Sequence, residues 1–348
     1  MFISAGKLRG LKRLCDAQGR FKMVAVDQRP PLIKGIGEKR GRPAAYEELA
    51  DVKALLTRRL LADGSAVLID PDYGFSTAEP DIRPDRGLLI TLEDFRFEET
   101  SDGRKTRIME GWSVDQIKRL GADGVKLLLW YRPDAGADVI RHQQDLVRRV
   151  GADCARCDIP LLLELLVYPF AGAANHTTDY IEDRDKRPEL VLQSARDFAD
   201  ASFGVDIYKL ESPLTAASLP DPEADMAETR VAQVWFDKLG AIIDRPWVML
   251  SAGAGMEEFR RVLGFAYRAG ANGYLAGRAI WWKAFGAYPD LAAMDASLAG
   301  EARGYMAEIN WLTDKLARPW QDAPAIGGRA MLAVAGHDFP ARYAGFCR

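Results

Sequence analysis

Cysteine and long apolar runs are both scarce in this sequence. Four cysteines among 348 residues are too few for a disulfide framework, so we expect a protein of the reducing cytoplasm. A membrane-spanning helix needs about 18 consecutive apolar residues, and no apolar run in this sequence is that long. Met1–Arg13 carries basic residues where a signal peptide needs apolar ones. The formal net charge of −3 gives no general attraction for nucleic acid or an anionic membrane. We therefore expect a soluble cytosolic protein with neither as a partner.

Short apolar runs recur along the chain between segments with helical spacing of apolar residues. Runs that are apolar on both faces are typical of parallel strands covered by helices. Eight such alternations over about 250 residues predict a single (β/α)₈ barrel (a TIM barrel), with a doubly wound open sheet as the alternative. The predicted strands are Met23–Asp27, Ala66–Asp70, Gly87–Leu92, Gly124–Trp130, Leu161–Leu166, Ile207–Glu211, Trp247–Ser251 and Gly273–Ala276.

The helical segments and the remaining residues complete a one-domain prediction. We expect the barrel core over residues 20–285, and a C-terminal helix and tail over residues 286–348. Asp72–Arg107 contains polar, irregular sequence, which predicts long loops after the second and third strands. The predicted helices are Tyr46–Ala62, Ser113–Leu120, Ala137–Cys157, Pro188–Ala201, Ala224–Ile243 and Met256–Ala269, with one more from Glu301 and a surface or partly ordered tail beyond Arg318.

The three histidines are placed poorly for metal binding. His142, His176 and His337 share no metal-ligand spacing, and none ends a predicted strand. A zinc enzyme needs clustered ligands, and a catalytic triad needs a histidine beside a strained serine turn. The sequence also lacks a P-loop and a dinucleotide fingerprint after the first predicted strand. We therefore expect no metal and no cofactor.

Three ionisable residues lie in the middle of predicted apolar strands. Lys126, Glu164 and Lys209 belong to the fourth, fifth and sixth strands, and a buried charge is costly unless it finds a partner. Because neighbouring strands lie about 4.8 Å apart, the three side chains should converge on one cavity at the same depth. Asp27 and Asp70 end the first two strands and add carboxylates at the same rim, where Asp70 either holds the following loop or touches a ligand.

Two amines beside one carboxylate are suited to amine catalysis. An ordinary lysine is protonated at neutral pH, with a pKa near about 10.4. A second ammonium and an apolar environment disfavour the charged form, so one lysine could attack a carbonyl as a free amine. Glu164 would then move the protons. This reasoning leaves open whether Lys126 or Lys209 is the nucleophile.

Glycine-rich turns follow the seventh and eighth predicted strands. Leu250–Gly255 reads LSAGAG and Leu275–Arg278 reads LAGR, each before a predicted helix. In barrels of this kind the loops after these two strands commonly bind phosphate through backbone N–H groups. Arg278 adds a permanently charged planar fork. The two turns predict a phosphate site.

Seven motifs in order along the chain carry a family resemblance. They are Ala25–Arg29 (AVDQR), Ile69–Gly74 (IDPDYG), Gly121–Lys126 (GADGVK), Ile159–Glu164 (IPLLLE), Tyr208–Pro213 (YKLESP), Leu250–Gly253 (LSAG) and Ala276–Arg278 (AGR). Together they resemble the class I tagatose-1,6-bisphosphate aldolases. That family folds as a (β/α)₈ barrel and cleaves ketose bisphosphates without a metal to dihydroxyacetone phosphate and glyceraldehyde 3-phosphate.

The resemblance implies roles for matching residues. Lys209 would form the Schiff base, Glu164 would be the acid/base, and Lys126 and Asp27 would complete the charged cluster. Gln28 and Arg29 would lie at the rim near the other end of the substrate. The residues implied to hold a phosphate are Ser251, Gly253, Gly277 and Arg278.

Some segments depart from this pattern and leave alternatives open. Pro30 and Pro31 replace a more flexible turn, and Val125–Arg132 (VKLLLWYR) and Ala276–Trp281 resemble the related sulfofructose phosphate aldolases. Those enzymes use the same lysine chemistry on a sulfonated sugar, whereas Ile69–Gly74 favours the tagatose branch. A sugar-phosphate-binding regulator with little turnover is a third candidate. We expect an exposed face with Trp281 and Trp282, which is compatible with a homo-oligomer interface or with packing under the tail.

Overall fold

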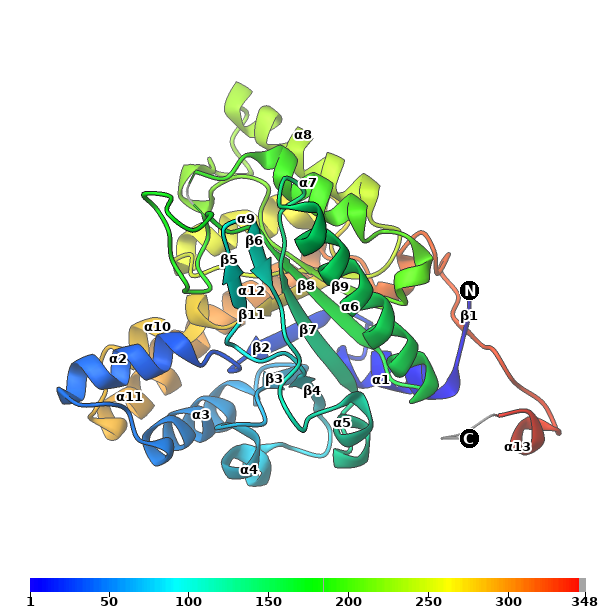
Figure 1. Ribbon diagram of the computed structural model, residues 1–348, viewed down its shortest axis with the longest axis horizontal. Coiled ribbons are helices and arrows are strands. Elements are labelled where there is room, and N and C mark those ends of the chain that lie inside the picture. The colour runs from blue at the N-terminus through cyan, green and yellow to red at the C-terminus, as the bar shows by residue number, and fades with distance from the viewer. Residues whose placement is uncertain (184, 344–348) are drawn as a thin grey trace.

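Eight parallel strands close into a barrel in the computed structural model, which describes residues 1–183 and 185–343. The barrel order is β10-β11-β2-β3-β4-β7-β8-β9 (Figure 1). The predicted barrel is confirmed, and each predicted strand lies within two residues of an observed one. The strands are β2 (Phe21–Ala25), β3 (Ala66–Ile69), β4 (Gly87–Thr91), β7 (Gly124–Trp130), β8 (Leu161–Leu166), β9 (Ile207–Leu210), β10 (Trp247–Met249) and β11 (Gly273–Ala276).

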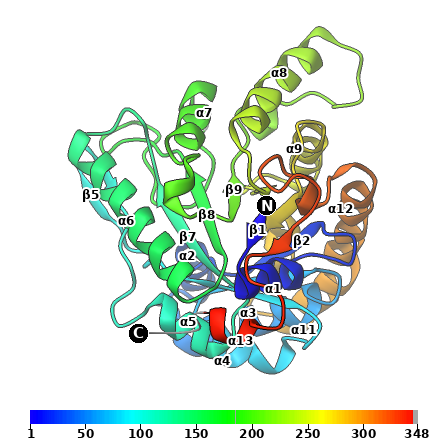
Figure 2. The same ribbon diagram turned by 90° about the vertical axis from the view of Figure 1, so that its right-hand side faces the viewer.

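Helices surround the barrel and cover its outer face (Figures 1 and 2). The longest, α6 (Ala137–Arg156), buries Val139, Leu146 and Val147 on one side, as an amphipathic helix against a sheet must. No described helix combines the length and the apolar character needed to cross a membrane. The other α-helices are α1 (Ala5–Leu14), α2 (Pro30–Arg40), α3 (Tyr46–Leu60), α4 (Phe75–Ala78), α5 (Val114–Leu120), α7 (Pro188–Asp197), α8 (Ala227–Ile242), α9 (Met256–Arg268), α10 (Arg278–Phe285), α11 (Leu291–Ser297), α12 (Arg303–Leu316) and α13 (Phe339–Arg342).

Shorter elements fill the connections. The polar stretch predicted as loops contains α4 and an antiparallel hairpin, so that prediction is wrong in part. Hairpin pairing gives backbone groups partners that an irregular loop would leave to water. These elements are η1 (Glu79–Asp81), β5 (Glu98–Thr100), β6 (Gly103–Lys105), η2 (Ala201–Phe203), η3 (Ala216–Ser218), a π-helical turn η4 (Leu298–Ala302) and η5 (Trp320–Asp322).

The amino end of the barrel is closed by the two ends of the described chain. Helix α1 buries Leu11 and Leu14 against residues near the amino ends of the barrel strands, such as Phe21. Trp320, in the tail that we predicted as a surface segment, is fully buried in the same cluster. Strand β1 (Phe2–Ile3) pairs in parallel with β12 (Met331–Leu332), close to the centre of the view in Figure 2. The tail is therefore part of the core at Trp320.

The two tryptophans on α10 have different environments. Trp281 is fully buried, and its indole N–H donates to the carbonyl of Ala25 over 3.0 Å. Only Trp282 is exposed, at 41% of its surface. Trp281 therefore joins α10 to the end of β2, and the expectation that it shares an exposed face is wrong.

A buried lysine joins the carboxyl ends of β2 and β3. Lys53, on α3, donates to Asp70 over 2.5 Å and to the carbonyls of Val26 and Gln28 over 2.5 and 2.9 Å. Lys53 and Asp70 have no exposed surface, and Asp70 also accepts from the backbone N–H of Tyr73. Asp70 thus holds the following loop, the structural alternative for this residue. The contact fixes the backbone on both sides of Asp27.

Replacing Lys53 should destabilise the fold strongly. Lys53→Met leaves Asp70 buried without its cation, and breaking such a pair costs about 3–5 kcal/mol. Urea unfolding should show this decrease in the free energy of unfolding. The exposed Lys12→Met on α1 is the matched control and should change it by less than about 0.5 kcal/mol. Equal effects of the two substitutions would contradict a stabilising role for the Lys53–Asp70 pair.

Candidate active site

A small cavity lies at the carboxyl ends of the strands, where barrels of this kind place their active sites. Its free volume is about 40 Å³. Nine of the ten site residues named from the sequence line it, and Gly253 does not. The nine are Asp27, Gln28, Arg29, Lys126, Glu164, Lys209, Ser251, Gly277 and Arg278.

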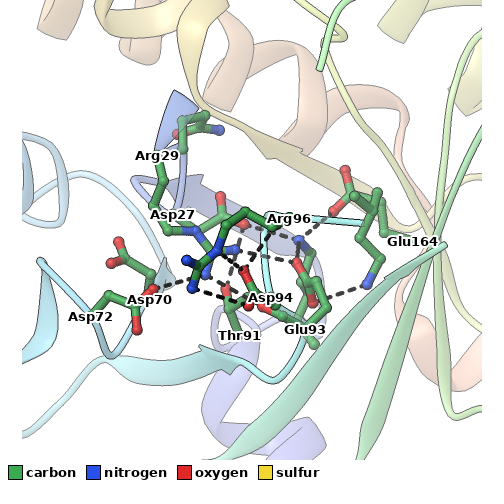
Figure 3. A network of polar contacts seen from close by, with 12 residues as sticks. Asp27, Arg29, Asp70, Asp72, Thr91, Glu93, Asp94, Arg96 and Glu164 are labelled. Carbon is green, nitrogen blue, oxygen red and sulfur yellow. Dashed lines mark hydrogen bonds and ion pairs between the residues drawn. The ribbon is translucent and has the colours of Figure 1, made fainter. Parts of the chain in front are cut away.

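Lys126 is the centre of the charged cluster. Its Nζ lies 2.6 Å from Glu93, 3.0 Å from Asp27 and 3.0 Å from Glu164. Figure 3 shows Asp27, Glu93 and Glu164 around the centre of this cluster, with Glu164 coming from within β8. Burial lowers the pKa of Lys126, but Asp27, Glu164 and Glu93 together outweigh burial and raise it well above its ordinary value. Lys126 is therefore a permanent ammonium, which the sequence alone did not establish.

Glu164 bridges the two lysines. In the sheet it pairs directly with Lys209 on β9, and its Oε1 lies 2.9 Å from Lys209 Nζ. Lys126 pairs with Leu162, two residues before Glu164, so the expectation that all three lie at one depth is wrong. The long Lys126 side chain reaches along the barrel to Glu164 Oε2. One carboxylate thus contacts both amines.

The charge balance also differs from the sequence-based expectation. Two amines and Glu164 were expected with Asp27 in the same cluster, whereas Glu93 and the guanidinium of Arg29 also lie there. The three carboxylates therefore offset the positive charge of Lys126, which weakens the electrostatic effect of that charge on Lys209. Burial raises the pKa of Asp27, but Lys126, Lys209 and Arg29 outweigh burial and hold it well below its usual range.

Glu93 is a site residue that the sequence reasoning missed. It is buried, and besides Lys126 it accepts from the backbone N–H of Leu128 over 3.0 Å. Burial raises its pKa, against the influence of Lys126 and Arg29. Glu93 follows the third predicted strand at once, as Asp27 and Asp70 end the first two. That position was the available signal, but the residue was assigned to a polar loop.

Arg29 and Gln28 line the cavity from the first turn after β2. Arg29 is 2% exposed and therefore buried, where a place at the rim was expected. Its guanidinium lies 3.7 Å from Glu93 and 3.5 Å from Asp72, and packs 5.3 Å from the ring of Phe95. The Nε of Arg29 and the Oε1 of Gln28 are buried without a hydrogen-bond partner among the described residues. These two unpaired atoms are available to a ligand.

The two glycine-rich turns meet beside the cavity. A Cβ on Gly277 would lie 2.5 Å from the carbonyl of Ala25, so only glycine fits where β11 approaches β2. Burial lowers the pKa of Arg278 to about 10, so its guanidinium is charged at neutral pH but poorly solvated. Ser251 is buried at the end of β10. Ser251, Gly277 and Arg278 form a pocket wall suited to an anion.

Gly253 lies outside this wall. Its φ of +82° needs glycine, and a Cβ there would meet Ile181 at 3.2 Å and Arg278 at 3.4 Å. It lines a neighbouring outer groove that Arg278 also borders. Gly253 therefore shapes the turn after β10 without facing the cavity.

Comparison with known sequences identifies related proteins. A model described as the DeoC/LacD family aldolase matches residues 21–283. Tagatose 1,6-diphosphate aldolase 1 of Enterococcus faecalis (strain ATCC 700802 / V583) is 30% identical over 282 residues, which cover 80% of this chain and 85% of that protein. Tagatose 1,6-diphosphate aldolase 2 of Streptococcus agalactiae serotype III (strain NEM316) is 28% identical over 328 residues, covering 92% and 99%.

Solved structures share the fold at lower identity. A fructose-bisphosphate aldolase from Plasmodium falciparum aligns with a TM-score of 0.60 and 13% identity, over 91% of this chain and 98% of that one. A Schiff-base-forming fructose-1,6-bisphosphate aldolase aligns with a TM-score of 0.53 and 16% identity, over 87% and 98%. At this identity the likeness establishes the barrel alone.

The lowered pKa of Asp27 should appear in the pH dependence of stability. A carboxyl whose pKa falls on folding stabilises the fold above its unfolded pKa, about 3.9, and this contribution is lost as pH falls further. The difference in free energy of unfolding between the wild type and Asp27→Asn should be largest at pH 6–7 and shrink below about pH 4. Denaturant titrations at each pH measure it.

The exposed Asp145→Asn on α6 is the control for this experiment. Its surface ion pair with Arg148 is worth little, so the difference from the wild type should stay near zero throughout. A difference for Asp27→Asn that is constant from pH 7 to pH 3 would contradict the electrostatic description of the cluster.

Proposed function

Because the chain belongs to the DeoC/LacD aldolase family, we propose that it is a class I aldolase, which cleaves a ketose 1,6-bisphosphate through a Schiff base on Lys209. The proposed substrate is tagatose 1,6-bisphosphate, and the products are dihydroxyacetone phosphate and glyceraldehyde 3-phosphate. The curated relatives that align over most of the chain are named as aldolases for this sugar. The proposal assigns each cavity residue a task in that reaction.

One observation carries the choice of lysine. Lys126 is surrounded by three carboxylates within 3.0 Å, and their combined field keeps its nitrogen protonated. Lys209 has one carboxylate partner, Glu164 at 2.9 Å, and its side chain lines the cavity. Lys209, which contacts one carboxylate and lines the cavity, is therefore the proposed nucleophile for the carbonyl carbon.

Formation of the Schiff base needs one proton acceptor and one proton donor. Lys209 passes a proton to Glu164, and its free nitrogen attacks C2 of the ketose to give a carbinolamine. Glu164 returns a proton to the C2 hydroxyl, which leaves as water, and the iminium remains on Lys209. The cluster then has the same charge as before, because an iminium replaces an ammonium.

Cleavage uses the iminium as an electron acceptor. Glu164 takes the proton of the C4 hydroxyl, the C3–C4 bond breaks, and its electron pair moves to the iminium nitrogen as an enamine. The aldehyde leaves, C3 takes a proton back from Glu164, and water hydrolyses the iminium to release dihydroxyacetone phosphate. Lys126 and Asp27 hold the side chain of Glu164 in position, and they stabilise its carboxyl group as the charge of that group changes during the reaction.

The proposal assigns each phosphate of the substrate to one guanidinium of the cavity wall. Ser251, Gly277 and Arg278 hold the phosphate next to the carbon that Lys209 attacks. Arg29, whose Nε is unpaired, contacts the phosphate at the other end, and the unpaired Oε1 of Gln28 accepts from a substrate hydroxyl. A planar guanidinium suits a phosphate because its parallel N–H groups match two oxygens.

Borohydride reduction should identify the nucleophile. With dihydroxyacetone phosphate present, the wild type should gain one adduct, located on Lys209 by peptide mapping, and lose activity. Lys209→Met should form no adduct and lose turnover by at least about 10³-fold, while the exposed Lys238→Met should behave as the wild type. An adduct on Lys126, or none in the wild type, would refute the proposed mechanism.

A substrate panel should separate the two aldolase alternatives. A phosphate dianion forms stronger charge-assisted hydrogen bonds with Arg29 than a sulfonate monoanion does. We expect kcat/KM for tagatose 1,6-bisphosphate to exceed that for 6-deoxy-6-sulfofructose 1-phosphate by roughly tenfold or more. Fructose 1,6-bisphosphate, the C4 epimer, belongs in the same panel. The reverse ranking would assign the chain to the sulfonated substrate, and ligand binding without turnover to a regulator.

A further inference from the structure

The loop between β8 and α7 covers the cavity. It comprises residues 167–187, of which all but Arg184 are described, and within it Tyr180 lines the cavity wall. Ligand pockets have volumes of about 300 Å³ upward, whereas the free volume here is about 40 Å³. A sugar phosphate that binds in this space would therefore lie against Tyr180 on this loop.

Backbone contacts dock the loop on both sides of Tyr180. Arg278 donates to the carbonyl of Tyr180 itself, and the N–H of Glu182 donates to the carbonyl of Ala252 over 2.9 Å. On the other side, Arg104 of the β5–β6 hairpin donates to the carbonyl of Thr177 over 2.5 Å. Tyr180 is thus held by its own main chain above the cavity.

The Tyr180 side chain is fixed by packing, but its hydroxyl has no partner. The ring lies 5.1 Å from the ring of Trp130. The hydroxyl oxygen is out of contact with solvent and forms no hydrogen bond within the described part of the chain. A buried hydroxyl without a partner is unfavourable by about 1–3 kcal/mol. This free-energy cost is removed when a ligand group forms a hydrogen bond with the hydroxyl.

Among the charged groups, Arg29 interacts most strongly with this hydroxyl. Burial raises the pKa of Tyr180 above its ordinary value, and Arg29 opposes this ahead of Lys126. The phenol is therefore neutral at physiological pH and can donate a hydrogen bond. Tyr180 and Arg29 line the same cavity, and in the proposed binding mode Arg29 contacts the half of the substrate beyond the C3–C4 bond.

Building on the proposed function, we propose that Tyr180 is a substrate-contacting residue whose hydroxyl donates a hydrogen bond to a hydroxyl of the half that leaves as the aldehyde. It selects for a polyhydroxylated aldehyde and plays no part in forming the Schiff base on Lys209. The substrate then provides a partner for the phenol oxygen of Tyr180, which is unpaired among the described residues. No carboxylate of the cluster needs to change its partner.

Tyr180→Phe tests this role without removing any hydrogen bond from the free protein. Cleavage of tagatose 1,6-bisphosphate should lose about tenfold in kcat/KM, the effect of one hydrogen bond. Exchange of the C3 proton of dihydroxyacetone phosphate with solvent requires the Schiff base but no aldehyde, and should stay within about twofold of the wild type. The melting temperature should be unchanged or higher.

Tyr131→Phe is the matched control. Tyr131 is also buried, but its hydroxyl donates to Asp197 over 2.8 Å outside the cavity. This variant should lower the melting temperature and leave both reactions unchanged, the opposite pattern to Tyr180→Phe.

The outcomes that would overturn the inference are distinct from failure of the proposed function. Unaltered cleavage by Tyr180→Phe, or a parallel loss of cleavage and proton exchange, would overturn the role of Tyr180. If the wild type neither exchanges the proton nor forms a borohydride adduct, the Schiff-base proposal itself fails. A normal wild-type adduct with a selective loss of cleavage in Tyr180→Phe would support both.

Discussion

The chemistry of this barrel depends on one ammonium held by three carboxylates. Lys126 contacts Asp27, Glu93 and Glu164 within 3.0 Å, and each of these groups would be costly to bury alone. Together they fix side chains that come from β7, β8 and the segments that follow β2 and β4. Lys126 contacts one oxygen of Glu164, so the other oxygen is left for Lys209. The catalytic proposal depends on this difference between the surroundings of two otherwise similar amines, Lys126 and Lys209.

Much of the architecture could be predicted from the sequence. Parallel strands buried on both faces are continuous apolar runs, which is why the eight barrel strands were located within two residues. A charge inside such a run is conspicuous, so Lys126, Glu164 and Lys209 stood out. Their relative depth along the barrel axis could not be predicted, since it depends on the register in which β7 pairs with β8. Register is set by the closed barrel and by no single strand.

Other features depend on contacts between segments far apart in sequence. Glu93 acts on Lys126 only after barrel closure, and Tyr180 reaches the cavity only because Arg278 and Arg104 hold the covering loop. Trp320 comes from a glycine- and proline-rich tail, where nothing local distinguishes a buried residue from an exposed one. Loops and tails follow no periodicity, so their packing has no signature comparable to the 2.0 or 3.6 residue repeat.

The pairing of β1 with β12 brings residues 2–3 beside residues 331–332 at the amino end of the barrel, whereas the cavity opens at the carboxyl ends of the strands. Attachment of the protein to a surface through either segment would therefore leave the path of small molecules unobstructed. The same closeness would let a short linker join the two segments in a circular permutant. New ends could then be cut in an exposed connection such as the turn before α8.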